Sequence, residues 1–213
     1  MSIQILSLGI LISAIIAIVF RQKENSIIFA IFKPLTTLLI ILIAVLIFRE
    51  TGSTYSAIMI LALVFSLIGD VFLIKDNYFL PGLVSFLIAH ICFIIGFTSL
   101  YGVDFNLTPL LFLALIGGLY FNFLRPYLKQ FTLPVLVYII VILVMNWQAI
   151  NLVISNGNQL FYALAVGSLL FSFSDSILAY NKFKKPFKSA EALILSTYWL
   201  AIFTFTIVGL YID

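Results

Sequence analysis

Five ionisable residues lie inside long apolar stretches of the sequence: Lys33, Asp70, His90, Asp175 and Glu191. A charge within a hydrocarbon span costs about 2.5–3.5 kcal/mol on insertion scales, so such residues are retained where they face a protein interior and act there. Asp70 and Asp175 are the most informative, because two carboxylates at matching depth suit general acid–base catalysis. If they lie close together, repulsion and burial keep one protonated while the other stays ionised.

The depth of these residues follows from the helical rise of about 1.5 Å per residue. Asp70 and Asp175 lie about 6 Å and about 7–8 Å from the cytoplasmic ends of their predicted helices. Lys33 and Glu191 enter at comparable depth on two other helices, and His90 lies deeper, at about 13–14 Å. Four ionisable groups from four helices are therefore predicted to share one layer.

Three of the five residues also suit purely structural roles. Lys33 suits snorkelling to the headgroups, Glu191 suits the dipole at a helix N-terminus, and His90 suits a hydrogen bond between helices. Asp70 and Asp175 have no such simple alternative, because intramembrane carboxylates are functional by default. We therefore assign the two aspartates as the catalytic candidates.

Other hydrolytic chemistries find little support in the sequence. A catalytic zinc needs about three protein ligands, commonly His or Cys, and the chain has one of each. No GxSxG, Walker A or GxGxxG pattern occurs. We expect neither a metal site nor a cofactor.

The composition excludes a water-soluble protein. Of the 213 residues, 64% are hydrophobic and 9% are charged, whereas a soluble domain carries roughly 25% charged residues. These values exclude a cytosolic enzyme, a secreted disulfide scaffold and a disordered tail. The net charge is 11 − 8 = +3 without a basic block, so we expect membrane lipids and no nucleic acid as partners.

The chain contains eight apolar runs that meet or approach the roughly 20 residues of a helical membrane span. The predicted fold is an all-α polytopic membrane helix bundle with eight transmembrane helices in a single transmembrane domain, residues 1–213. The predicted spans are Ile3–Phe20, Ile27–Phe48, Tyr55–Ile74, Pro81–Leu100, Leu107–Phe123, Phe131–Val153, Gln159–Tyr180 and Ser189–Tyr211.

The distribution of positive residues predicts the orientation of the bundle. The loops after the first, third, fifth and seventh spans carry nearly all of them, and the opposite loops offer only Arg49. The positive-inside rule therefore predicts a protein of the inner (cytoplasmic) membrane with both termini outside the cytoplasm. The cations in the cytoplasmic loops are Arg21, Lys23, Lys75, Arg125, Lys129, Lys182, Lys184, Lys185 and Lys188.

The two halves of the chain share a spacing. Asp70 lies 11 residues before Pro81 and Asp175 lies 11 residues before Pro186, so both pairs are offset by 105 residues. This spacing suggests a four-plus-four parallel repeat in which the third and seventh helices are equivalent. Chance is the alternative, because proline is common near helix starts.

At these residues the sequence resembles the YhhN-like lysoplasmalogenase family of eight-helix membrane proteins. The matching features are Lys33-Pro34, Gly69-Asp70 with Leu73, Phe86 with His90, Pro134-Val135, Tyr138, Met145, Ser174-Asp175, Leu178-Ala179, Phe183 and Tyr198. The last helix departs from the family pattern. A small residue and then a glutamine are expected after the tyrosine, whereas Tyr198 is followed by Trp199, Leu200, Ala201 and Ile202.

The resemblance implies hydrolysis of the vinyl ether bond of lysoplasmalogens to a fatty aldehyde and a glycerophospho-base, with no cofactor. Asp70 and Asp175 would supply acid and base in an order that the sequence leaves open, as it does the choice of choline or ethanolamine and the oligomeric state. The candidates for binding the lysophospholipid are Lys33, which would hold the phosphate, His90, Tyr138, Tyr198 and Glu191.

Two other classes of function fit the same residues. Paired acids in repeated halves also describe a proton-coupled transporter. A non-catalytic lipid-binding protein is the third reading. Turnover separates an enzyme from a binding protein, and flux across sealed vesicles separates an enzyme from a transporter.

Overall fold

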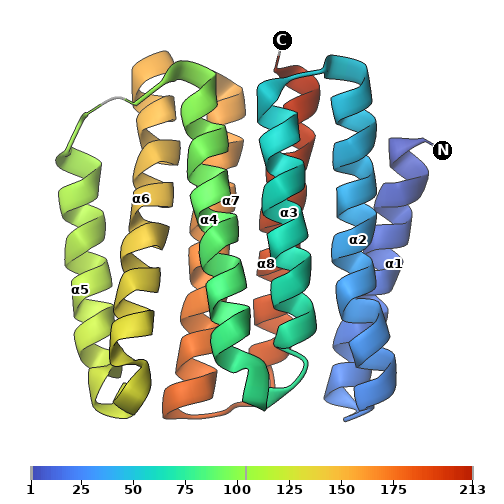
Figure 1. Ribbon diagram of the computed structural model, residues 1–213, viewed down its shortest axis with the longest axis vertical. Helices are drawn as coiled ribbons and strands as arrows, with labels where there is room; N and C mark the ends of the chain where they lie inside the picture. The colour runs from blue at the N-terminus through green and yellow to red at the C-terminus, as the bar shows by residue number, and fades with distance from the viewer. Residues whose placement is uncertain (1, 104, 213) are drawn as a thin grey trace.

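The computed structural model describes residues 2–103 and 105–212, and these residues form eight α-helices and no strand (Figure 1). The helices are α1 (Ile3–Gln22), α2 (Ser26–Thr51), α3 (Thr54–Phe72), α4 (Phe79–Tyr101), α5 (Thr108–Leu128), α6 (Thr132–Asn156), α7 (Gln159–Ala179) and α8 (Ala190–Val208). Four short turns accompany them: η1 (Asp76–Tyr78), η2 (Lys129–Phe131), η4 (Gly209–Tyr211) and the π-helical η3 (Tyr180–Lys184).

Local sequence signals set several of the helix ends. The side chains of four N-cap residues each accept a hydrogen bond from a first-turn backbone N–H: Ser2, Asn25, Ser53 and Asn158. Gly52 and Gly157 follow α2 and α6 with φ of 62° and 60°, which glycine adopts without steric cost. The links between helices are short, so successive helices run antiparallel. The odd-numbered links, which follow α1, α3, α5 and α7, lie together at one end of the bundle (Figure 1).

Aromatic side chains fill the centre of the bundle. Helix α8 packs against α1, α2, α3 and α7, and α4 packs against α3 and α6. Where α4, α7 and α8 meet, neighbouring ring centroids are 5.0 to 6.3 Å apart. These rings belong to Phe86, Phe93, Phe171, Tyr198 and Phe205.

Gly69 allows one of these rings to reach the candidate site. A Cβ atom at Gly69 would lie 2.6 Å from the ring of Phe86. The glycine therefore lets the Phe86 ring of α4 pack directly on the turn of α3 that carries Asp70.

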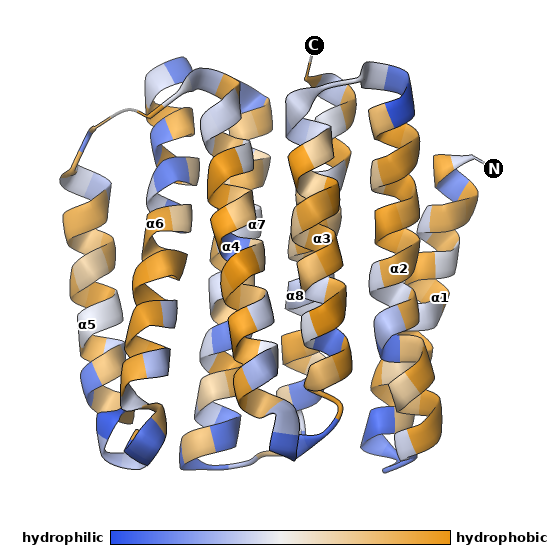
Figure 2. Cartoon of the chain, in the orientation of Figure 1, coloured by the Kyte–Doolittle hydropathy of each residue, from blue (hydrophilic) through white to orange (hydrophobic). Residues whose placement is uncertain are grey.

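The helices consist mainly of hydrophobic residues, as Figure 2 shows, and many of the large ones are exposed on the outside of the bundle. Leu111 and Phe112 of α5, for example, are 71% and 64% exposed. Seven continuous helical stretches of the described residues are long and apolar enough to cross a membrane. The longest, Thr108–Asn156, has 49 residues and contains both α5 and α6, which lie side by side in Figure 1. The chain is a multi-pass membrane protein.

The predicted all-α membrane bundle is confirmed. The number of membrane crossings, the internal repeat and the single domain stay predictions. Helix α5 was expected to end at Phe123 but continues to Leu128. Leu124 and Leu128 are fully buried against Val135, and this packing extends the helix past the polar Arg125.

Candidate active site

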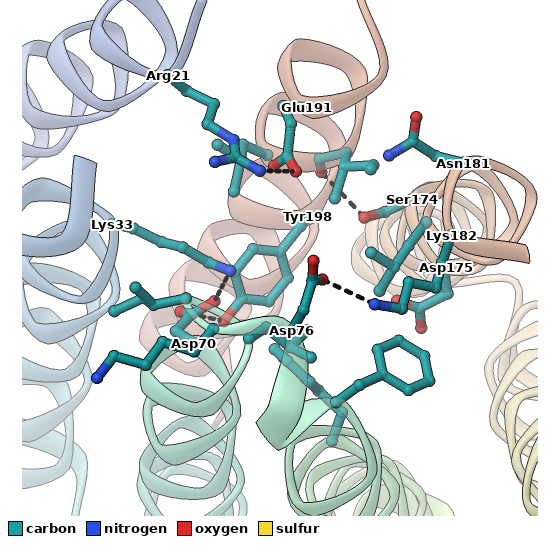
Figure 3. A pocket seen from close by; sticks show the side chains of 18 of the residues that line it. Arg21, Lys33, Asp70, Asp76, Ser174, Asp175, Asn181, Lys182, Glu191 and Tyr198 are labelled. Atoms are coloured by element: carbon teal, nitrogen blue, oxygen red, sulfur yellow. Dashed lines mark hydrogen bonds and ion pairs between the residues drawn. The ribbon is translucent and has the colours of Figure 1, made fainter. Parts of the chain in front are cut away.

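A polar cavity of about 460 Å³ lies at the end of the bundle where the odd-numbered links gather (Figure 3). Side chains from α1, α2, α3, α4, α7 and α8 and from two of the links line it. The lining combines four cations with four carboxylates, so the cavity suits a ligand that carries both charges. These residues are Arg21, Lys33, Lys75 and Lys182, and Asp70, Asp76, Asp175 and Glu191.

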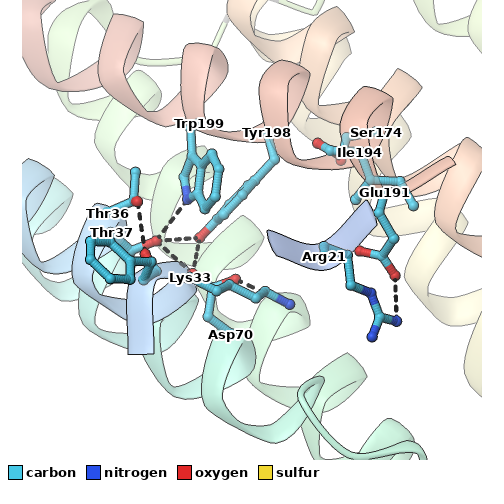
Figure 4. A network of polar contacts seen from close by, with 11 residues as sticks. Arg21, Lys33, Thr36, Thr37, Asp70, Ser174, Glu191, Ile194, Tyr198 and Trp199 are labelled. Atoms are coloured by element: carbon cyan, nitrogen blue, oxygen red, sulfur yellow. Dashed lines mark hydrogen bonds and ion pairs between the residues drawn. The ribbon is translucent and has the colours of Figure 1, made fainter. Parts of the chain in front are cut away.

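Asp70 is a buried carboxylate held by three donors. Its side chain is 1% exposed. The hydroxyls of Thr37 and Tyr198 donate to Oδ2 at 2.5 and 3.0 Å, and Nζ of Lys33 lies 3.7 Å from Oδ1 (Figure 4). Burial of an unpaired charge is costly, and charge-assisted bonds offset that cost. Asp70 thus has the partners of an ionised carboxylate.

A second layer of contacts orients Thr37. The indole Nε1 of Trp199 on α8 donates to the Thr37 hydroxyl at 3.2 Å (Figure 4). Thr37 lies four residues after Lys33, which places both side chains on one face of α2. Helices α2, α3 and α8 are therefore joined around Asp70.

Asp175 on α7 has a different environment. Its side chain is 12% exposed, and Oδ2 accepts a 2.9 Å hydrogen bond from the hydroxyl of Tyr138 on α6. Nε2 of His90 on α4 lies 3.6 Å from the same oxygen. The described residues contain no lysine or arginine in an ion pair with Asp175.

The other ring nitrogen of His90 defines how the imidazole meets Asp175. Nδ1 lies 2.6 Å from the backbone oxygen of Phe86, and a carbonyl oxygen only accepts. Nδ1 therefore carries a hydrogen, and in the neutral ring Nε2 is an acceptor directed at the carboxyl group. Nε2 is buried, and among the described residues it has no hydrogen-bond partner.

Two ion pairs lie at the mouth of the cavity. Arg21 meets Glu191 at 3.1 Å, and Lys182 meets Asp76 at 2.7 Å (Figure 3). These side chains are partly or largely exposed, so each pair contributes little to stability. Glu191 also lies in the first turn of α8, where the helix dipole favours an anion.

Beyond the two carboxylates, toward the other end of the bundle, the interior is closed by aromatic rings. Phe93, Phe97, Phe171 and Phe205 are each 0% exposed and contact one another. Aromatic packing therefore fills the interior on the side of the polar cavity that faces away from its mouth.

The structure brings most of the predicted residues together. Lys33, Asp70, Asp175, Glu191 and Tyr198 line the polar cavity. Tyr138 lines a second, apolar cavity that also touches Asp175. His90 lies behind Asp175 and is not among the residues that line these two cavities. Lys33 is only 7% exposed and points to Asp70, so it does not snorkel.

Sequence reasoning missed the uncharged members of the site. Thr37 and Trp199 support Asp70 but stand as ordinary residues in apolar helices. The sequence signal for Thr37 was its position four residues after Lys33, which places it on the same face of the helix. Arg21 was assigned to a loop, but it lies in the last turn of α1 and, together with Asp76 of η1, lines the cavity.

The chain was compared with known proteins. The model of the YhhN family matches residues 28–208. Lysoplasmalogenase TMEM86A from Bos taurus is 37% identical over 150 residues, which cover 65% of this chain and 59% of that protein. Lysoplasmalogenase TMEM86B is 31% identical over 155 residues in Homo sapiens (70% and 62%) and 30% identical over 184 residues in Rattus norvegicus (84% and 70%).

The aligned part of the chain thus spans less than two thirds of the length of TMEM86A. No solved structure matches the chain. The family match covers most of the sequence, including Asp70 and Asp175. The chain therefore belongs to the YhhN family.

Proposed function

We propose that the chain is a membrane-embedded hydrolase that cleaves the vinyl ether bond of lysoplasmalogens, releasing a fatty aldehyde and a glycerophospho-base. One observation carries the proposal. Asp70 and Asp175, from different helices, line one polar cavity in a chain whose relatives are named lysoplasmalogenases.

The chemistry of a vinyl ether requires an acid and a nearby anion. A proton is added to the outer alkene carbon, which forms a C–H bond and leaves an oxocarbenium ion at the carbon bonded to oxygen. Water adds to that carbon and loses a proton. The resulting hemiacetal loses its hydroxyl proton and breaks its bond to the glycerol oxygen, which takes up a proton as the aldehyde forms. Glycosidases stabilise a similar ion with two carboxylates.

In this proposal Asp175 is the acid. Its Oδ2 faces Nε2 of His90 at 3.6 Å, and the Phe86 carbonyl fixes the hydrogen of the imidazole on Nδ1. An acceptor nitrogen facing Oδ2 favours the protonated form of the Asp175 carboxyl group. The Tyr138 hydroxyl, 2.9 Å from Oδ2, orients the group. His90 is thus a positioning residue and proton partner for Asp175.

Asp70 acts as the anion. Its contacts with Lys33, Thr37 and Tyr198 favour the ionised form. A fixed negative charge on the same cavity stabilises the oxocarbenium ion and accepts the proton that water loses.

The charged mouth of the cavity suits a phospholipid headgroup. Lys33, Arg21 and Lys75 offer positive charge for the phosphate. Glu191 and Asp76 offer negative charge for the amine of the base. When a zwitterionic headgroup binds, its phosphate would pair with a cation and its amine with a carboxylate of the two ion pairs at the mouth. These contacts would replace those that the side chains make with each other.

The test is mass spectrometry of purified protein incubated with a 1-alkenyl lysophospholipid. We expect a fatty aldehyde and the matching glycerophospho-base. The 1-acyl and saturated 1-alkyl lysophospholipids with the same headgroup are the controls, and both should stay intact. Failure to release aldehyde, with proton flux in sealed vesicles, would favour a transporter instead.

We further propose that the polar cavity opens to the cytoplasm, with both termini on the outer side of the inner membrane. The support is the gathering of cations at the cavity end of the bundle. In a Cys92→Ser background, Lys23→Cys and Ser53→Cys lie at opposite ends. A membrane-impermeant maleimide should label Ser53→Cys in intact cells and label Lys23→Cys only after lysis. The reverse pattern would invert the orientation.

A further inference from the structure

A second cavity, of about 260 Å³, lies between α4, α5, α6 and α7. Three residues line both this cavity and the polar one: Phe79, Asp175 and Leu178. The carboxyl group of Asp175 therefore lies at the boundary between a charged chamber and an apolar one.

The walls of the second cavity are mainly hydrocarbon. Ile142 of α6 and Leu113 of α5 face it and are almost fully buried. Gly117 of α5 also lines it, and a Cβ atom there would lie 2.7 Å from Leu143 of α6. Helices α5 and α6 are thus in close contact along this wall, and the apolar lining suits a hydrocarbon chain.

The cavity opens sideways to the bilayer. Ile116 of α5 and Leu169 of α7 line it and are 50% and 48% exposed. On the side nearer the polar mouth, the Tyr120 hydroxyl of α5 donates to the Ser176 backbone oxygen of α7. This hydrogen bond joins α5 and α7 at the end of the opening nearer the polar mouth. A hydrocarbon chain would therefore leave the cavity toward the middle of the membrane.

The bundle has another apolar cavity on its outer surface, of about 470 Å³, between α1 and α8. Its lining includes Ile10, Leu11 and Phe203 but neither Asp70 nor Asp175. Of these two lateral cavities, only the one between α5 and α7 reaches a carboxylate.

We propose that the single hydrocarbon chain of the substrate occupies the cavity between α4, α5, α6 and α7 and passes between α5 and α7 into the bilayer. The labile bond then lies at Asp175 and the headgroup lies in the polar cavity. Leu169 lies six positions before Asp175 on α7, so the enclosed part of the hydrocarbon chain is about 9 Å long. That this hydrocarbon chain is an alkenyl group rests on the proposed function.

The first test does not require turnover. A saturated alkyl-ether lysophosphatidylethanolamine with a diazirine in its chain is photolysed with the purified protein in nanodiscs. We expect labels on α5 and α7 near Ile116 and Leu169, and we expect excess unmodified lysophosphatidylethanolamine to suppress them. Labels in the cavity between α1 and α8, or spread evenly over the outer surface, would overturn the proposal even if the protein releases aldehyde.

The second test uses matched variants and applies to the active protein. Ile116→Trp fills the opening, whereas Leu115→Trp adds the same ring at a neighbouring residue that is 60% exposed and does not line the cavity. We expect Ile116→Trp to raise KM about ten-fold or more for a long-chain alkenyl lysophospholipid and to leave a short-chain, water-soluble analogue unaffected. Leu115→Trp should change neither.

If Ile116→Trp is folded and active and its KM depends on the length of the hydrocarbon chain as in the wild type, the proposed position of the hydrocarbon chain is contradicted. If the wild-type protein cleaves neither substrate, the proposed function fails, and the labelling pattern alone decides where the hydrocarbon chain binds.

Discussion

Nζ of Lys33 on α2 lies 3.7 Å from Oδ1 of Asp70 on α3, and the two side chains are 7% and 1% exposed. The pair joins two helices within the apolar interior. Removal of one partner from such a pair leaves a buried charge without compensation, which costs more than the pair itself contributes.

Lys33→Met should therefore destabilise the protein by about 3–5 kcal/mol, because Asp70 loses its cation. Thermal unfolding in detergent measures the effect. The double variant Lys33→Met, Asp70→Asn should regain much of the stability and remain inactive. Arg21→Gln, at the exposed pair with Glu191, should cost less than about 1 kcal/mol. Equal losses of stability for Lys33→Met and Arg21→Gln would show that the buried Lys33–Asp70 pair matters no more for stability than the exposed pair.

Thr37→Val removes the hydroxyl that joins Asp70 to Trp199. We expect a loss of about 1–3 kcal/mol in stability, because a buried acceptor and a buried donor both lose a partner. Aldehyde release should fall as well. Thr37→Ser keeps the hydroxyl and should retain most of both properties. If Thr37→Val unfolds at the wild-type temperature, the network around Asp70 is not needed for stability.

Gly69→Ala introduces a Cβ atom 2.6 Å from the Phe86 ring. The ring must shift, and we expect a cost of about 1–3 kcal/mol. Because the Phe86 backbone oxygen holds Nδ1 of His90, aldehyde release should also decline. Gly118→Ala, where a Cβ atom has open space, is the matched control and should behave as wild type.

His90→Phe keeps an aromatic ring against Phe171 but removes both nitrogens. If the imidazole shares the proton of Asp175, turnover should fall about 10²- to 10⁴-fold while folding is maintained. Cys92→Ala, two residues along α4, controls for disturbance of the helix. A folded His90→Phe protein with wild-type turnover would remove His90 from the mechanism.

The sequence was sufficient to predict the helical bundle and the layer of charges. A charge in an apolar run is visible without coordinates, which is why Asp70 and Asp175 could be assigned. The matching depth of the two carboxylates followed from the rise of a helix. That they line one cavity was an expectation that the sequence alone could not establish, because it depends on how α3, α7 and α8 are rotated against one another.

The difference between the two carboxylates also required the structure. Asp70 pairs with Lys33, whereas Asp175 meets His90 and Tyr138. The sequence grouped His90 with the residues that line the pocket, but packing of α4 directs it to the back of Asp175. Uncharged partners such as Thr37 carry no signal of their own in an apolar helix.

The most direct test of the two-carboxylate account is the rate of fatty aldehyde release by purified Asp175→Asn from a 1-alkenyl lysophospholipid. The asparagine keeps the size of the side chain and cannot supply the proton. The account predicts a protein with the thermal unfolding profile of wild type and a rate lower by about 10²-fold or more. A folded Asp175→Asn protein that releases aldehyde at the wild-type rate would contradict it.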